Sequence, residues 1–325
     1  MSQLIESYKE LVRAYQKTIV LPEGEDKRVI KAAEMIVEDG FCKVILLGDA
    51  DVIRAKSSKL ANVQIINPKT SDKLDGYADY LFELRKAKGL TREQAYELVK
   101  DVMYYGVMMV KLGDADGMVG GACHSTGDLL RPALQIIKTA PNIKAVSGFF
   151  VMYNPNVEKF GKLLFADCAV TPFPKEEELA DFAICANASA KKFVTDTPKI
   201  AMLSFSTRGS AKNDDVTKVA NATAIVRERA PEIEIEGEIQ FDAAIVEEVG
   251  QLKCPGSKVA GHANVFIFPD LNAGNIGYKI LQRLGGYQAY GPICQGMAKP
   301  CNDLSRGCIA EDIVGVVAMT ALQSI

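Results

Sequence analysis

Short apolar runs alternate with longer segments of helical periodicity along most of the chain, and this alternation limits the folds open to it. Runs such as TIVLP at 18–22 and KVILLG at 43–48 are typical of strands that are buried on both faces. Strands that alternate with helices form βα units around a mostly parallel sheet. The pattern therefore predicts the α/β fold class.

The expected strands are distributed over the whole chain. They lie at 18–22, 43–48, 63–67, 116–121, 145–152, 163–170, 199–205, 259–270 and 287–293. Local signals mark several of the helices between them. Thr91 with Gln94 fits a capping box, and Asp26 precedes a helical segment that ends at Gly40. We therefore expect a sheet with helices on both faces.

The length of 325 residues corresponds to about two domains. No low-complexity or Ser/Gly-rich linker marks a boundary, and the strand–helix pattern is weakest near 140–146. The final helical segment, 305–325, has an apolar face that needs a sheet to cover it. We therefore predict a discontinuous first domain, 1–145 plus 296–325, and a second domain, 146–295.

The composition excludes several kinds of partner. The formal charge is −3, from 38 basic and 41 acidic residues, and no Lys/Arg block could neutralise many phosphates at once, so we expect no nucleic-acid partner. Apolar stretches fall short of the roughly 20 residues that span a bilayer, and the N-terminus lacks the pattern of a signal peptide. Eight cysteines without CxxC spacing indicate reduced thiols. We therefore expect a cytoplasmic protein that does not bind membranes.

Several well-known motifs are absent from the sequence. It contains no GxGxxG after a first strand, no GxxxxGK[ST], no HExxH and no GxSxG. These absences disfavour redox chemistry on a Rossmann-bound cofactor, P-loop phosphoryl transfer and zinc hydrolysis. We expect neither a metal nor a permanently bound cofactor. The two histidines, His124 and His262, are more often structural than catalytic in such a context.

The first candidate binding loop is GGACHSTGDLLRP at 120–132. Two glycines end an expected strand, Ser125 and Thr126 supply hydroxyls, and a helix follows with Arg131 one turn inside it. The amides at a helix start attract anions. This loop therefore predicts a phosphate-sized site, and an ordinary Ser/Thr cap with a solvated arginine is the alternative.

The second candidate is the segment 296–312. Arg306 beside Ser305 suits a planar or tetrahedral oxyanion, because the guanidinium presents a fork of donors. Asp312 lies next to Ile313 in a helix that must pack its apolar side inward. The alternative role for Asp312 is to complement the positive end of that helix.

The third candidate is the segment 268–286. It contains Asn275, followed by Lys279 and Arg283 four residues apart on one helical face. Such a face could bind a diphosphate or could be a solvated stripe.

Two other parts of the sequence carry weaker signals. The segment 203–214 runs from a strand into hydroxyls and basic residues, so it could be another anion site or a capped loop. Arg28 and Arg85 are single basic residues on expected helices and become candidates for substrate binding only together with the loops above. The residues alone thus indicate an enzyme or a binder of a phosphorylated small anion.

Taken together, these loops resemble the phosphate acetyltransferase (phosphotransacetylase) family. The matching strings cover nearly the whole chain from residue 19 to the last helix. They are IVLPEGEDKRVIKAAE, HSTGDLLRPALQIIKT, LSFSTRGSA, EIQFDAAIV, VFIFPDLNAGNIGYKILQRLGG and GPICQGMAKPCNDLSRGC.

The resemblance implies a fold and a reaction. The fold would be two α/β domains with mostly parallel sheets and an active-site cleft between them, similar to the isocitrate and isopropylmalate dehydrogenase architecture, in a homodimer. The reaction would be reversible transfer of an acetyl group between acetyl phosphate and coenzyme A (CoA), in a direct ternary complex. CoA would be a substrate, and phosphate would be the other product.

The resemblance also implies residue roles. Asp312 would be the general base for the CoA thiol, and Ser305 and Arg306 would hold the acyl phosphate and the developing negative charge. Arg85 and Arg131 would help to bind CoA or phosphate. Ser125 and Thr126 would contribute to the phosphoryl pocket.

Three alternatives stay open. The chain could be a phosphate butyryl- or propionyltransferase of the same family, or a non-catalytic relative that binds acyl-CoA. A dehydrogenase on a similar scaffold is disfavoured, because no acidic metal-binding cluster adjoins a basic substrate loop.

Overall fold

The computed structural model describes residues 2–325, and the chain divides into two compact units. The first unit contains the chain up to Lys138 together with Met297–Ile325, and the second is Thr139–Gly296. The domain boundaries predicted at 145/146 and 295/296 refer to parts of the chain that fold independently. They stay a prediction.

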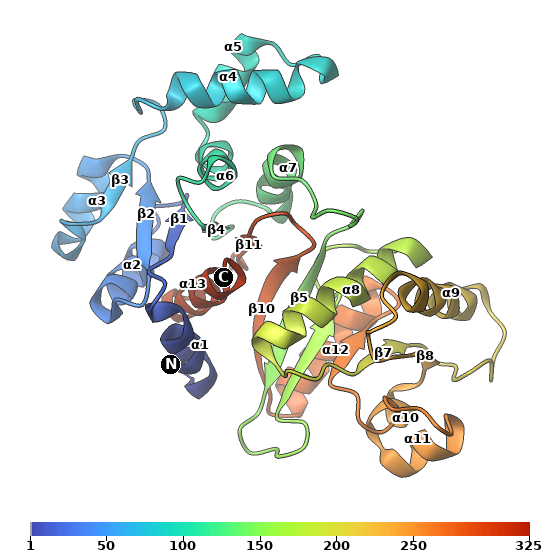
Figure 1. Cartoon of the computed structure of the whole chain (residues 1–325). Helices are drawn as coiled ribbons and strands as arrows, with labels where there is room; N and C mark the ends of the chain where they lie inside the picture. Colours follow the sequence, from blue (N-terminus) through green and yellow to red (C-terminus); the bar gives the residue numbers. More distant parts are fainter. Residues whose placement is uncertain (1) are drawn as a thin grey trace. The chain divides into compact units, whose positions relative to one another are not determined.

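The first unit is built on a parallel sheet of five strands in the order β11-β4-β1-β2-β3 (Figure 1). Its strands are β1 (Thr18–Leu21), β2 (Lys43–Leu47), β3 (Gln64–Ile66), β4 (Gly117–Gly120) and β11 (Cys301–Asp303). Its helices are α1 (Gln3–Arg13), α2 (Lys27–Asp39), α3 (Ala50–Lys56), α4 (Leu74–Arg85), α5 (Arg92–Val99), α6 (Val102–Leu112), α7 (Thr126–Ile136) and α13 (Ala310–Gln323), with short 3-10 turns at Ser58–Leu60 and Lys86–Lys88.

Helices cover both faces of this sheet. Figure 1 shows α1, α2 and α13 on one face and α6 and α7 on the other. Helix α13 is buried along most of its length and packs on β1 and β4. At Gly117 of β4 a Cβ would lie 2.7 Å from Thr320 of α13, so the helix approaches the strand as closely as only a glycine allows.

The second unit contains a mixed sheet of six strands in the order β10-β5-β6-β9-β7-β8. The pairs β10–β5 and β5–β6 are antiparallel, and the other neighbours are parallel. The strands are β5 (Ser147–Tyr153), β6 (Lys162–Ala166), β7 (Ile200–Leu203), β8 (Ile235–Ile239), β9 (Val265–Ile267) and β10 (Gln288–Gln295). The helices are α8 (Glu176–Phe193), α9 (Asp214–Arg229), α10 (Phe241–Ile245), α11 (Glu247–Lys253) and α12 (Leu271–Leu284).

The predicted α/β class with mostly parallel sheets is confirmed, as are the capping box of Thr91 with Gln94 and the ends of α2 at Asp26 and Gly40. Two strands, β8 and β11, were not predicted, and the long run 259–270 forms only the three-residue strand β9. No helix within residues 2–325 has both the length and the apolar content to cross a bilayer.

Candidate active site

Three loops of the first unit meet at one edge of its sheet. They follow β1, β4 and β11, which are parallel neighbours, so their carboxyl ends share that edge. Ligands of α/β proteins bind outside the carboxyl ends of the strands. This edge is therefore the candidate site, and it contains most of the residues that the sequence singled out.

Glu23, in the loop after β1, binds the loop after β4. The residue is 7% exposed, and its carboxylate accepts the backbone N–H groups of Ala122 at 2.7 Å, Cys123 at 2.6 Å and His124 at 2.9 Å. The Nδ1 atom of His124 lies 2.7 Å from the same carboxylate. These amides are therefore engaged by the protein itself and are not an open anion cradle.

Ser125 occupies the N-cap of α7. Its side chain accepts the N–H of Asp128 at 3.3 Å, and the Asp128 carboxylate accepts both the backbone N–H of Ser125 at 3.1 Å and the Ser125 hydroxyl at 2.6 Å. This is the capping arrangement that the sequence left open as the alternative for Ser125. Its predicted place in a phosphoryl pocket stays a prediction.

Thr126 joins the loops after β4 and β11, because its hydroxyl donates to the Oδ2 atom of Asp303 at 2.5 Å. Asp303 is 6% exposed, and its Oδ1 atom is the buried side-chain atom that lacks a hydrogen-bond partner among residues 2–325. Gly121, with φ of +101°, lies so close to that atom that a Cβ on it would be 2.1 Å away, so only glycine fits at this position. Burial raises the pKa of the Asp303 carboxyl to about 6, the hydrogen bond from Thr126 opposes this rise, and the charge of Glu23 adds to it.

The raised pKa of Asp303 predicts a pH-dependent gain in stability for Asp303→Asn. A buried acid whose pKa rises on folding stabilises the folded state only when it is protonated, so its contribution is lost as the pH rises from 3.8 through about 6. At pH 8 we expect Asp303→Asn to raise the free energy of unfolding by about 3 kcal/mol, and at pH 4 we expect no difference. Urea unfolding at both pH values tests this, with exposed Glu228→Gln as control. A variant less stable than wild type at pH 8 would contradict the prediction.

Ser305 and Arg306 are exposed on the loop after β11, two and three residues after Asp303. Asp312 is also exposed, in the first turn of α13, and its carboxylate accepts the N–H of Ile309 at 3.0 Å. It thus complements the helix N-terminus, as the alternative interpretation has it. The next residue, Ile313, is fully buried, so the helix packs its apolar side inward as expected while the Asp312 side chain stays exposed.

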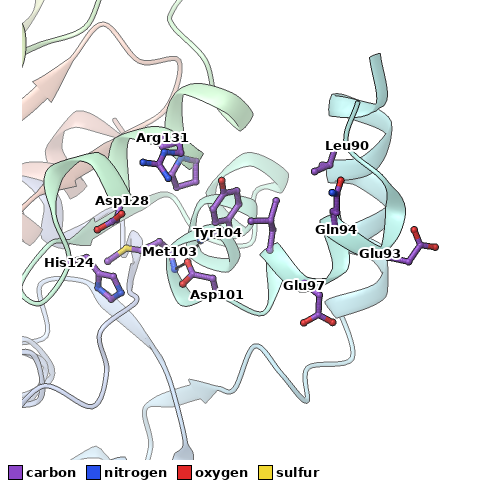
Figure 2. A pocket seen from close by; sticks show the side chains of 12 residues that line it. Leu90, Glu93, Gln94, Glu97, Asp101, Met103, Tyr104, His124, Asp128 and Arg131 are labelled. Atoms are coloured by element: carbon purple, nitrogen blue, oxygen red, sulfur yellow. Dashed lines mark hydrogen bonds between the residues drawn. The ribbon is translucent and has the colours of Figure 1, made fainter. Parts of the chain in front are cut away.

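A cavity of about 840 Å³ adjoins the loop after β4 (Figure 2). Its walls come from α5, α6, α7 and the segments before them. The lining residues are Leu90, Glu93, Gln94, Glu97, Leu98, Asp101, Met103, Tyr104, His124, Asp128, Arg131 and Pro132. The size is typical of small-molecule and cofactor sites.

The positive charges of Arg131 and Arg85 both affect Tyr104, a residue that lines this cavity. Burial raises the pKa of the Tyr104 hydroxyl, and the positive charges of Arg131 and Arg85 oppose that rise. Figure 2 shows Arg131 beside Tyr104. The charges of Arg85, at the end of α4, and of Arg131, in the middle of α7, therefore act on the same tyrosine, and of the two only Arg131 is among the cavity-lining residues.

The remaining candidates lie in the second unit. Asn275 of α12 donates to the carbonyl of Cys168 at 3.2 Å, whereas Lys279 and Arg283 are exposed on the same helix. Lys279 lies 5.8 Å from the centre of the Tyr278 ring. The three residues share a helix, and their predicted contact with substrate stays a prediction.

Acidic side chains of β8 bind the basic and polar groups of the loop at 203–214. Arg208 pairs with Glu236 at 2.7 Å, and Glu238 accepts the Ser206 hydroxyl at 3.0 Å and the N–H of Gly209 at 2.7 Å. The Arg208 guanidinium, the Ser206 hydroxyl and the Gly209 N–H are thus engaged within the unit, as expected for a capped loop. Among residues 2–325, no group of three or more His, Cys, Asp and Glu side chains is placed to hold a metal ion.

Sequence reasoning missed Glu23 as a functional residue and gave Asp303 no role. Glu23 follows the apolar run at 18–22, in LPEGED. An acidic residue at the carboxyl end of an expected strand was the signal that could have found it, because strand ends are where α/β proteins place their site residues. Asp303 follows Cys301 and Asn302 with no apolar run before it, so no such signal marks it in the sequence.

Comparison with known proteins shows the family of the chain. The model of the family described as "Phosphate acetyl/butaryl transferase" matches residues 3–321. A phosphate acetyltransferase of Acetivibrio thermocellus is 54% identical, over 100% of this chain and 98% of that protein. The crystal structure of a phosphotransacetylase from Streptococcus pyogenes superposes with a TM-score of 0.95 at 47% identity, covering 100% of this chain and 99% of that one.

A more distant structure supports the fold alone. A putative 4-hydroxythreonine-4-phosphate dehydrogenase from Salmonella typhimurium has a TM-score of 0.57 at 12% identity, over 95% of this chain and 99% of that one. The dehydrogenase-like architecture predicted from the resemblance is therefore confirmed at the level of fold. Given the family match and the identity over the full length, the chain is an acyltransferase that belongs to the phosphate acetyl/butaryl transferase family.

Proposed function

We propose that the protein transfers an acetyl group reversibly between acetyl phosphate and CoA, with acetyl-CoA and phosphate as the products. The observation that carries this proposal is the 54% identity to a phosphate acetyltransferase along the whole chain. The site residues implied by the resemblance are all present, and Ser305 and Arg306 are exposed on one loop.

CoA binds in the 840 Å³ cavity of the first unit, where the lining residue Arg131 receives its phosphates near Tyr104, and the positive charge of Arg85 favours them too. The apolar wall formed by Leu98, Met103 and other lining residues suits the uncharged arm of the molecule. Thr126, in the first turn of α7, contacts the phosphoryl group through its backbone N–H, because the amides at the start of a helix favour anions and its hydroxyl already donates to Asp303.

Asp312 removes the proton of the CoA thiol. An unperturbed thiol has a pKa of about 8.5 against about 3.9 for a carboxyl, so this transfer is uphill by roughly 6 kcal/mol in water. The positive charge of Arg306 lowers that cost by stabilising the thiolate. The thiolate then attacks the carbonyl carbon of acetyl phosphate, the C–O bond to phosphate breaks, and phosphate leaves with the electron pair.

The transfer is direct, within a ternary complex. Cys308 is the thiol nearest to the proposed site residues in the sequence, and it is 5% exposed. Burial raises the pKa of its thiol, although the charge of Arg28 lowers it. A buried, protonated thiol is a poor nucleophile, which supports a reaction without an acetylated cysteine.

The protein acts as a homodimer in the cytoplasm. Helix α12 exposes Ile276, Ile280 and Leu284 at intervals of four residues, with 57%, 54% and 85% of each residue exposed. An apolar stripe of this kind is typical of a subunit interface. The eight free cysteines support a reducing compartment.

The assay that tests the function mixes the protein with CoA and acetyl phosphate and follows the thioester absorbance. We expect acetyl-CoA to form without added metal or nicotinamide, and acetyl phosphate to react faster than propionyl phosphate and butyryl phosphate. Mass spectrometry of the quenched enzyme should show no acetyl group on Cys308. A higher rate with butyryl phosphate would support the butyryltransferase alternative, and binding without turnover would support the non-catalytic one.

A further inference from the structure

Arg28, in the first turn of α2, directs all five of its side-chain N–H groups at oxygen atoms of the protein. Nε donates to Asp26 at 3.0 Å, and Nη2 donates to Asp26 at 2.9 Å and to the carbonyl of Ala122 at 2.8 Å. Nη1 donates to the carbonyls of Arg306 at 2.7 Å and Cys308 at 3.3 Å. A guanidinium has five N–H donors and no acceptor, so none is left for a substrate anion.

These acceptors belong to the loops that carry the proposed site. Ala122 lies in the loop after β4, and Arg306 and Cys308 lie in the loop after β11. Arg28 therefore ties both loops to the start of α2. Glu23 complements this tie from the same β1–α2 connection, since it accepts the N–H groups of the loop after β4 while Arg28 donates to carbonyls.

Asp26 fixes the guanidinium in this position. Its carboxylate binds Arg28 through both oxygens and also accepts the backbone N–H of Arg28 at 2.8 Å. The hydrogen bond from Arg28 lowers the pKa of the Asp26 carboxyl well below its ordinary value. The pair is therefore ionised throughout the range in which an enzyme works.

We propose that Arg28 is a positioning residue, which holds the backbone of Arg306 so that the Arg306 side chain points at the reacting group. This inference rests on the proposed role of Arg306, and it replaces the substrate-binding role predicted for Arg28 from sequence. The carbonyl that Arg28 binds at 2.7 Å belongs to Arg306 itself. A displacement of about 1 Å in a catalytic group can cost roughly a hundredfold in rate.

A double-mutant cycle tests the inference, with Arg28→Ala, Arg306→Ala and the double variant. We expect Arg28→Ala to lower kcat roughly ten- to a hundredfold and to leave the KM values for CoA and acetyl phosphate nearly unchanged. In the Arg306→Ala background, the same substitution should have almost no further effect on kcat, because the group that it positions is already gone. Arg28→Lys should recover little, since one ammonium cannot replace the fork.

The matched control is Arg13→Ala. Arg13 makes the same kind of contact, donating to the carbonyl of Asp39 at 2.6 Å and to its carboxylate at 2.7 Å, but on α1. It should lose stability without loss of kcat. If Arg28→Ala does not fold, Arg28→Gln keeps part of the donor set and enters the same cycle.

Each outcome decides between the roles. A raised KM for either substrate that persists in the Arg306→Ala background would show that Arg28 binds substrate, and additive losses of kcat would show that it does not act through Arg306. Either result would overturn the inference. Wild-type turnover in Arg306→Ala would instead remove the proposed role of Arg306 and leave the acetyl transfer itself to be judged by the thioester assay.

Discussion

Arg306→Ala is expected to lower turnover by about two to three orders of magnitude. Negative charge builds up on the carbonyl oxygen of acetyl phosphate and then on the leaving phosphate, and a preorganised donor at such an oxyanion is worth about 3 to 4 kcal/mol in other enzymes. Arg306 is exposed on its loop while its carbonyl is held by Arg28. Its side chain is thus accessible, and its backbone is fixed.

The measurement is the steady-state rate of thioester formation at saturating CoA and acetyl phosphate. Arg54→Ala, which removes an exposed arginine of α3 in the same unit, is the control and should keep the wild-type rate. Guanidinium ion added to Arg306→Ala should restore part of the rate, because it supplies the missing donor. A variant with more than a tenth of wild-type turnover would remove Arg306 from the chemistry.

The fold was predictable because its signal is local. Strands buried on both faces are apolar throughout, and residues 18–22 and 43–48 show this directly. Strand β8 was missed because it contains Glu236 and Glu238, and charged residues are unusual in a buried strand. In the structure the carboxylate of Glu236 pairs with Arg208, and that of Glu238 accepts the Ser206 hydroxyl, so neither needs contact with solvent. No pattern along the chain reveals such partners, since they lie about 30 residues away.

The candidate site was predictable only in part, for the same reason. Hydroxyl and basic side chains at strand ends are visible in the sequence, and Ser125, Thr126 and Arg306 were proposed in this way. The sequence does not show which groups bind the amides of these loops or the guanidinium of Arg28. Glu23 is about 100 residues away from the amides that it accepts, and Arg28 binds backbone carbonyls, which every residue has. Spacing therefore located the loops but not the contacts that hold them.

The contact of Asp312 with Ile309 makes a sharp test of the proposed base possible. The carboxylate accepts the N–H of Ile309 at 3.0 Å, and an asparagine side chain also has an oxygen that can accept this hydrogen bond. Asp312→Asn should therefore preserve the start of α13 and remove only the capacity to take a proton. Asp312→Ala, by contrast, would remove both the hydrogen bond to the Ile309 N–H and the proton acceptor. Loss of such a cap costs about 1 kcal/mol of stability.

Asp312→Asn is expected to bind CoA as wild type does and to lose turnover by about two to four orders of magnitude, the usual contribution of general-base catalysis. Calorimetric titration with CoA and the thioester assay measure the two properties separately. Glu311→Gln is the matched control, because it removes an exposed carboxylate one residue earlier in the same turn, and it should change neither. Since the thiol reacts as the thiolate, the residual rate of Asp312→Asn should rise about tenfold per pH unit below the thiol pKa of about 8.5. A rate close to wild type at neutral pH would show that another group, or water, accepts the proton of the thiol.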